Sequence, residues 1–202
     1  MKTNRVELSL AIGLILTILL TSFCSFAGAC GQIRQDVIRL HVLANSDTDA
    51  DQALKLRVRD RVLEETEQIF LNAGDKQDAA KRVQESLPAI ETAARQVIDE
   101  NGYDYDVNVT FQNEYFTTRE YENFTLPAGH YDAVRVKIGE AAGKNWWCVM
   151  FPPLCIPAAE SEKKVESVIG EDGAEIISNK PKYEFKFKIL EVFEDIGQWF
   201  RG

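Results

Sequence analysis

The chain has 202 residues, of which 45% are hydrophobic and 27% are charged. This length suits one domain or two small ones, and the composition excludes a mostly disordered chain, a collagen, a coiled coil and a multi-span membrane protein. The net charge of -9 argues against nucleic acid as a partner, because binding to phosphates needs clustered positive charge. With two histidines in the whole chain, we expect no metal site and no bound cofactor.

The first 29 residues have the pattern of an export signal. Lys2 and Arg5 give a positive start, and no residue from Leu8 to Phe26 is charged. Two interpretations of this segment stay open. Ala27-Gly28-Ala29 is a small-residue cleavage site, which would release an exported domain over residues 30–202. Alternatively the uncharged run, which is as long as the roughly 20 residues that cross a bilayer, remains as a membrane anchor.

Export also changes what we expect of the cysteines. Cys148 and Cys155 lie in the body of the domain, and a nearby pair of thiols outside the cytoplasm can persist as a disulfide. The alternative is that both are reduced and pack as small hydrophobic side chains. Their spacing does not fit a zinc site, which needs closer pairs and two more ligands. We favour the disulfide.

The hydrophobic pattern next predicts a strand and two helices. The strand covers residues 36–44 and is apolar enough to be central in a sheet. Turn and cap residues follow over 45–51. We expect a first helix to about Ala73 and a second over 78–101, with a kink or a restart at Pro88.

From residue 107 the period changes to two, which is typical of half-buried strands. We expect strands over 107–111, 115–122, 134–138 and 146–151, a turn at 126–130 and a hairpin loop at 139–145. Residues 158–182 are charged and weakly patterned, which predicts a flexible excursion, and 183–200 have the spacing of an amphipathic helix. This order predicts an α+β fold, a single two-layer domain with helices packed on one face of a mainly antiparallel sheet.

Residues after the first strand have the composition of two known sites without their full pattern. His41, Ser46 and Asp47 are the residue types of a catalytic triad, but no nucleophile-elbow glycines accompany them. Ser and Asp at this position are typical of helix caps. A calcium-loop pattern that starts at Asp47 fails where Gly and Glu are needed, at Gln52 and Val58.

Two further features are suited to contact with another protein. In the predicted helix after residue 51, Lys55 and Arg59 lie near the apolar face, where one of them can pair with a carboxylate or meet a partner. Trp146 and Trp147 begin an apolar, aromatic stretch that ends at Pro153. This stretch is either a central strand or an aromatic patch for protein contact.

Two long blocks carry a resemblance to a known family. The first runs from Ile38 through Asn45-Ser46-Asp47 to Asp60, and the second from Gly143 to Cys155. Shorter similarities lie between them, at residues 121–129 and 131–133. In order and spacing these blocks resemble the stage II sporulation protein R family.

The resemblance implies an exported signal of endospore formation rather than an enzyme. Such proteins are made in the forespore and cross its membrane into the space that faces the mother cell. There they trigger a membrane-embedded aspartic protease, which processes the precursor of the sporulation sigma-E factor. Two alternatives stay open, an extracytoplasmic hydrolase that uses His41 and a membrane-tethered structural domain of the cell envelope.

We expect one region of the fold to form or support the surface that contacts this protease. Its candidate residues are His41, Asn45, Ser46, Asp47, Lys55, Arg59, Trp146 and Trp147. A two-layer domain can bring the end of the first strand close to the Trp146-Trp147 strand, although about 100 positions separate the two blocks. Membrane contact is expected only through the N-terminal segment.

Overall fold

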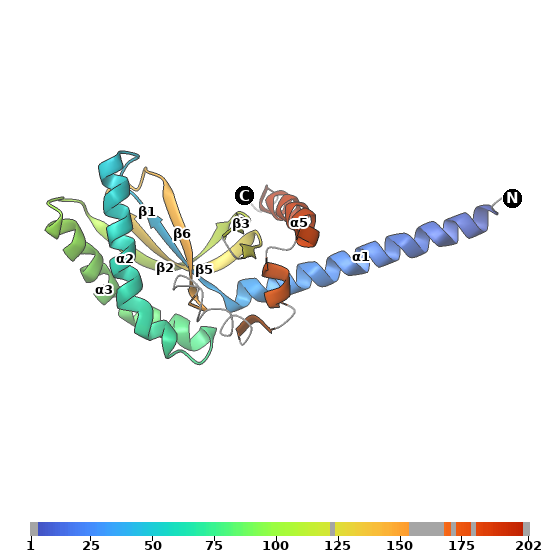
Figure 1. The fold of residues 1–202 in the computed structure, drawn as a ribbon, viewed down its shortest axis with the longest axis horizontal. Coiled ribbons are helices and arrows are strands. Elements are labelled where there is room, and N and C mark those ends of the chain that lie inside the picture. Colours follow the sequence, from blue (N-terminus) through green and yellow to red (C-terminus); the bar gives the residue numbers. More distant parts are fainter. Residues whose placement is uncertain (1–3, 122–123, 154–167, 171–172, 179–180, 200–202) are drawn as a thin grey trace.

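The computed structural model describes residues 4–121, 124–153, 168–170, 173–178 and 181–199 (Figure 1). Its named helices are α1 (Arg5–Asp36), α2 (Asp49–Leu71), α3 (Lys76–Glu100) and α5 (Pro181–Trp199). Its strands are β1 (Ile38–Leu43), β2 (Val107–Phe116), β3 (Arg119–Glu120), β4 (Thr125–Leu126), β5 (Gly129–Ile138) and β6 (Asn145–Phe151).

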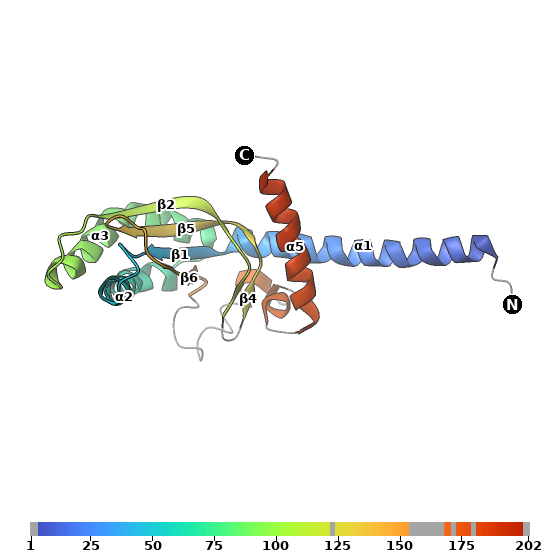
Figure 2. The ribbon, with the colours of Figure 1, turned by 90° about the horizontal axis from the view of Figure 1, so that it is seen from above.

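The longest element, α1, projects away from the rest of the molecule. Its N-terminal half stands free, while its C-terminal end enters the body beside the sheet (Figure 1). Seen from above, α5 crosses α1 near the point where α1 meets the body (Figure 2). α1 is long and apolar enough to cross a membrane, with a mean hydropathy of 2.3 over its most apolar window. This finding is compatible with either a signal peptide or a membrane anchor.

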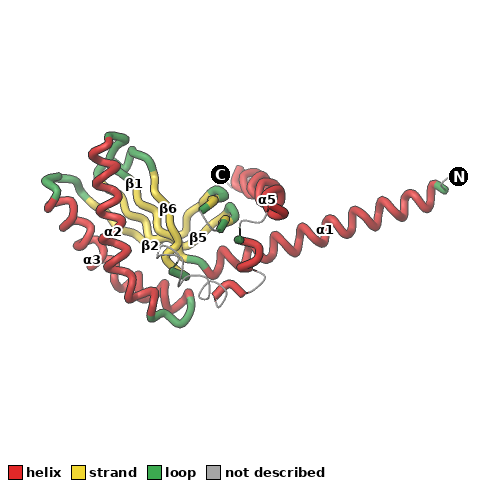
Figure 3. The backbone as a smooth tube through the Cα atoms, in the orientation of Figure 1, coloured by secondary structure: helices red, strands yellow, loops and turns green. Residues whose placement is uncertain are grey.

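The body is built on a four-stranded sheet in the order β2-β5-β1-β6. β1 is parallel to β5 and antiparallel to β6, and β2 is antiparallel to β5. α2 and α3 lie together along one face of this sheet (Figure 3). The predicted α+β class is therefore confirmed, and so is the central position of the first strand.

The predicted hairpin at 139–145 is wrong, because β6 does not pair with β5. β1 lies between them, so the chain leaves β5, passes over the end of β1 and returns as β6 on its far side. Element boundaries differ as well. α1 extends to Asp36, β2 continues to Phe116, and β5 already begins at Gly129, inside the predicted turn. Pro88 lies within the continuous helix α3 rather than at a restart.

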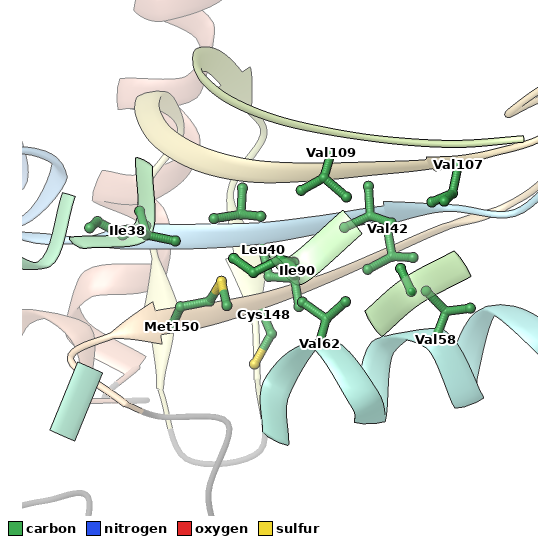
Figure 4. Close-up of a cluster of buried hydrophobic side chains, with 14 of the residues drawn as sticks. Ile38, Leu40, Val42, Val58, Val62, Ile90, Val107, Val109, Cys148 and Met150 are labelled. Atoms are coloured by element: carbon green, nitrogen blue, oxygen red, sulfur yellow. The ribbon is translucent and has the colours of Figure 1, made fainter. Parts of the chain in front are cut away.

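The main core fills the space between the sheet and the two helices. Alternate residues of β1, Ile38, Leu40 and Val42, point toward α2 and α3, where they meet Val58 and Ile90 (Figure 4). Full burial of one such aliphatic side chain contributes about 1.5–3 kcal/mol. Both helices begin at capped ends: the side chain of Thr48 accepts the Asp51 N–H, and that of Asp75 accepts the Asp78 N–H. The core and the caps together fix where α2 starts, directly after β1.

A second, smaller core lies on the opposite face of the sheet. It joins the C-terminal part of α1, the sheet and α5, and its fully buried members include Cys30, Ile33 and Tyr131. Phe26 of α1 stacks on Tyr183, with 5.9 Å between the ring centroids. The body is therefore not complete without the last third of α1.

Two sequence predictions concern residues that are only partly described. Cys148 is buried and disulfide-bonded, but Cys155 lies outside the described residues, so the pairing of these two stays a prediction. Of the segment 158–182, residues 158–167, 171–172 and 179–180 also lie outside the description. Within its described part, Ile169 and Ile176 are buried in the second core.

Candidate functional site

The loop that crosses the end of β1 is held there by the turn Asn45-Ser46-Asp47. Asn45 Oδ1 accepts a hydrogen bond of 3.0 Å from the backbone N–H of Glu140. Asp47 Oδ1 accepts one of 2.6 Å from the N–H of Lys144. The loop is not part of a β-ladder, so these N–H groups have no strand partner. The side chains of the turn supply the acceptors that they need.

Two glycines let the crossing loop approach the turn this closely. Gly139 has φ +54°, and a Cβ there would lie 2.2 Å from Asn45 Oδ1. A Cβ at Gly143 would lie 2.2 Å from the carbonyl oxygen of Ser46. A larger residue at Gly143 would force the loop or the turn to move, and one at Gly139 would be strained by the positive φ and would displace the Asn45 side chain. Through Gly143, this packing brings the second sequence block into contact with the turn of the first.

Asp51 joins the same turn from the first turn of α2. Its carboxylate accepts hydrogen bonds from Ser46 Oγ at 2.5 Å and from Asn45 Nδ2 at 2.9 Å. These two bonds, that from Ser46 first, hold the pKa of the Asp51 carboxyl below its usual range. Ser46 and Asp47, which composition likened to part of a triad, therefore belong to a hydrogen-bonded turn and cap, and the third triad-like residue, His41, lies elsewhere.

Lys55 lies one turn further along α2 and is buried. Its Nζ donates to Gln52 Oε1 at 2.6 Å and to the carbonyl oxygen of Lys144 at 2.9 Å. Burial lowers the pKa of this amine. On the same side, Arg59 lies over the ring of Trp146, 4.7 Å from its centroid. We call Asn45, Ser46, Asp47, Asp51, Lys55 and Lys144 the crossing-loop cluster.

A second group of polar side chains lies on the face of the sheet opposite α2 and α3. His41 Nδ1 lies 2.8 Å from Glu114 Oε1 on β2, and its ring stacks on Trp147 with 5.5 Å between centroids. Arg119 covers the same Trp147 ring at 3.7 Å from its centroid. We call Arg39, His41, Glu114, Arg119, Arg135 and Trp147 the open-face cluster.

Glu114 is the carboxylate of the open-face cluster. Burial by itself would raise the pKa of this carboxyl, but the hydrogen bond with His41 and the charges of His41 and Arg135 lower it below the usual value. Arg135 Nη1 lies 3.7 Å from Glu114 Oε2. The Glu114 carboxylate therefore interacts with two basic side chains, those of His41 and Arg135.

Arg39 is fully buried, which is rare for an arginine. Its guanidinium lies 4.0 Å from the ring centroid of Phe116, and Nη2 donates to the hydroxyl of Tyr121 at 2.8 Å. Across the described residues, Arg39 Nε and Nη1, His41 Nε2 and Arg135 Nε have no hydrogen-bond partner. Buried donors and acceptors of this kind are normally satisfied, and of the five unpartnered side-chain atoms in the described residues four belong to the open-face cluster, the fifth being Thr118 Oγ1.

The structure separates the residues that the sequence placed in one region. Trp146 and Trp147 are neighbours on β6, so they point to opposite faces, Trp146 toward the main core and Trp147 toward the second. His41 follows Trp147 onto the open face, whereas Asn45, Ser46, Asp47, Lys55 and Arg59 lie at the helix side or at the end of the sheet. Their role in partner contact stays a prediction.

Sequence reasoning did not select Arg39, Glu114, Arg119 or Arg135. Arg39 could have been selected, because it is a charged residue between Ile38 and Leu40 in a strand predicted to be buried. A buried charge needs hydrogen-bond or charge partners elsewhere in the fold. Glu114 joins His41 across 73 positions of the sequence, a distance at which no spacing pattern operates. Among the described residues, no group of His, Cys, Asp and Glu could hold a metal ion.

Comparison with known proteins gives one family and one named relative. Residues 34–161 match the family described as stage II sporulation protein R. The stage II sporulation protein R of Bacillus subtilis (strain 168) is 38% identical over 123 residues, which cover 61% of this chain and 55% of that protein. The chain therefore spans little more than half the length of that relative. No solved structure matches the chain.

Proposed function

Because the chain belongs to the stage II sporulation protein R family, we propose that it is an exported signal without enzymatic activity. In this proposal it activates a membrane-embedded aspartic protease, and the activated protease processes the sigma-E precursor. The observation that carries the proposal is the match over residues 34–161, which includes all four strands of the main sheet and both polar clusters.

The geometry around His41 favours a signal over the hydrolase alternative. A hydrolase would need a nucleophile within hydrogen-bond reach of the imidazole. Ser46 Oγ instead donates to Asp51, and Asp47 accepts from the backbone of Lys144. The carboxylate beside His41 is Glu114, and His41 is 9% exposed. These residues stabilise a turn and a sheet face rather than form a reaction centre.

We further propose that α1 is retained as a membrane anchor after export. Cleavage after Ala29 would remove Phe26, which is 3% exposed and packs against α5. It would also place Cys30, which is fully buried, at a new charged terminus. A retained α1 keeps the second core intact and holds the signal at the surface of the membrane it has crossed.

The open face around Trp147 is our candidate for contact with the protease. Trp147 and Arg119 form a half-buried aromatic and cationic pair, and such residues dominate the energy of protein interfaces. The crossing-loop cluster is a weaker candidate, because its side chains are already bonded to one another and to the loop.

The test is co-expression of the full chain with the protease and the sigma-E precursor, scored by precursor processing. We expect processing only when this chain is present and exported. Absence of processing with folded, exported protein would contradict the proposed function and favour the envelope structural alternative. Deleting residues 1–29 should abolish signalling across the membrane.

A matched pair of substitutions tests the contact surface in the same assay. Trp147→Ala should reduce processing more than it reduces the amount of folded protein. Trp146→Ala, the same change one residue away on the helix side, should reduce processing only as far as it lowers the melting temperature. If processing falls only in proportion to the loss of folded protein in both variants, both tryptophans have a purely structural role.

A further inference from the structure

The helix α5 packs against the body through two buried apolar side chains, Phe187 and Leu190, and through a set of acidic side chains. Glu194 forms an ion pair of 3.0 Å with Arg34, and Asp195 Oδ1 accepts a 2.7 Å hydrogen bond from the hydroxyl of Tyr115. Glu191 accepts from the backbone N–H of Thr118 at 3.3 Å. Three acidic residues of α5 are thus used in holding the helix against the body.

The outward side carries an exposed apolar row at helical spacing. Its members are Val192, Phe193, Ile196 and Trp199, which are between 47% and 78% exposed. The outer side of a surface helix in a soluble protein is normally polar, whereas α5 carries apolar residues on its outer side as well as on its buried side. Four large apolar side chains on one helix face therefore mark a surface that contacts something apolar.

This row continues the exposed apolar surface of α1. The large apolar side chains of α1 from Val6 to Leu20 are all about half exposed or more. Immediately after them, Phe23 meets Phe193 of α5 with 5.8 Å between ring centroids, and Lys186 Nζ donates to Ser22 Oγ at 3.1 Å. The two apolar surfaces join at Phe23.

The placement of α5 along α1 fits the thickness of a bilayer. Arg5 and Phe23 are about 27 Å apart along the helix axis at 1.5 Å per residue. A hydrocarbon core is about 30 Å thick, so a bilayer with Arg5 at one surface has its other surface near Phe23. α5 crosses α1 at that level instead of running along it (Figures 1 and 2). A helix in this position lies in the plane of the membrane surface.

We propose that α5 is an interfacial helix whose row Val192, Phe193, Ile196 and Trp199 inserts into the bilayer that α1 spans. A phospholipid surface fits the row better than a protein partner, because the row is continuous with the anchor and ends in tryptophan, a residue enriched at membrane interfaces. The inference rests on the proposed retention of α1 and extends membrane contact beyond the N-terminal segment. Its consequence is that the sheet is held at a fixed height and orientation above the membrane.

The test uses the full chain in vesicles of phosphatidylethanolamine and phosphatidylglycerol, with part of the lipid carrying brominated acyl chains. Bromine quenches tryptophan only at short range, and Trp146 and Trp147 lie in the sheet. The emission of Trp199 is obtained as the difference between the wild-type protein and Trp199→Phe. We expect most of this emission to be lost in brominated vesicles. Unquenched Trp199 in protein whose α1 resists alkaline extraction would overturn the inference and leave the anchor standing.

Extraction of the wild-type protein by alkali would overturn the anchor and the inference together. A second variant, Phe193→Ser with Ile196→Ser, should abolish the quenching of Trp199 while α1 stays inserted. The control Lys188→Ser changes an exposed polar residue of the same helix and should leave the quenching unchanged. If Trp199 is unquenched in lipid but shifts its emission when the protease is added, the row binds protein and the inference is wrong.

Discussion

The crossing-loop cluster and the open-face cluster both adjoin β1, but they differ in how their polar atoms are satisfied. In the crossing-loop cluster, Asp51 accepts two side-chain hydrogen bonds and Lys55 donates two hydrogen bonds. In the open-face cluster, four nitrogen atoms are buried without a partner among the described residues. A satisfied network stabilises one arrangement of the chain, whereas unsatisfied buried donors cost free energy. A contribution to stability is thus enough to account for the residues of the crossing-loop cluster. It accounts for those of the open-face cluster only in part.

The largest effect should come from the close approach in the crossing-loop cluster. Gly143→Ala places a Cβ 2.2 Å from the backbone oxygen of Ser46, so the loop or the turn must move. We expect the free energy of unfolding to fall by about 3 kcal/mol, the upper part of the usual range for overpacking. Denaturant unfolding measures this change.

The matched control for Gly143→Ala is Gly74→Ala. A Cβ at Gly74 meets nothing within 4 Å, so its effect should not exceed about 1 kcal/mol in either direction. Equal stability of the two variants would show that the crossing loop is not packed against the turn as described.

A smaller loss is expected when the acceptor at the centre of the crossing-loop cluster is removed. Asp51→Ala leaves the Ser46 hydroxyl and the Asn45 amide without their carboxylate, at a cost of about 2 kcal/mol. Asp49→Ala removes an exposed carboxylate from the same first turn of α2 and should cost about 0.5 kcal/mol through the helix dipole alone. If both variants unfold at the same denaturant concentration, the network contributes nothing beyond that dipole.

The turn and the helix cap within the crossing-loop cluster could be predicted from the sequence because their signals are local. Asn, Ser and Asp before a helical pattern predict a turn and a cap, and both were found. What the sequence did not predict is the second role of these side chains as acceptors for loop 139–144. That role depends on β6 crossing β1, and the short loop with two glycines was equally compatible with a hairpin.

The open-face cluster could not be predicted, because its members meet only in the folded sheet. β1, β2, β5 and β6 contribute one or two residues each and β3, in the two-stranded sheet, contributes Arg119; within the main sheet, which residues face each other depends on register. The amphipathic pattern of α5 was visible in the sequence, but the pattern alone does not say which of its apolar residues face the body. In the structure, Phe187 and Leu190 are buried, and Glu194 pairs with Arg34 of α1.

The third prediction tests the electrostatics of the open-face cluster through Glu114→Gln. The pKa of Glu114 is lowered in the folded protein, so its ionised form stabilises the fold above the usual carboxyl pKa and this contribution is lost as pH falls. The variant should have a lower melting temperature than the wild type at pH 7. This difference in melting temperature should shrink as the pH falls below about 4.5, where Glu114 of the wild type begins to be protonated. Melting curves across this range give the result, with Glu140→Gln, an exposed carboxylate of the crossing loop, as the control. A difference that does not change with pH would exclude an ionic role for Glu114.

The smallest effect is expected where the open-face cluster is most unusual, at Arg39. Its guanidinium is fully buried, packs on Phe116 and makes one hydrogen bond, to Tyr121, while two of its nitrogen atoms have no partner in the described part of the chain. Arg39→Met keeps an unbranched chain against the ring and removes the desolvated charge. Because the lost contacts and the relieved desolvation oppose each other, the free energy of unfolding should change by no more than about 1 kcal/mol.

The companion variant Arg39→Ala separates packing from charge at this position. It leaves the space of the side chain empty beside Phe116, and we expect a loss of about 2 kcal/mol. If Arg39→Met is as destabilising as Arg39→Ala, the charge itself stabilises the fold and the cluster is structural, like the crossing loop. If Arg39→Met is as stable as the wild type but fails to activate the protease in the processing assay, the buried cation serves recognition. The two outcomes therefore decide whether the open-face cluster has a role in signalling or, like the crossing-loop cluster, only stabilises the fold.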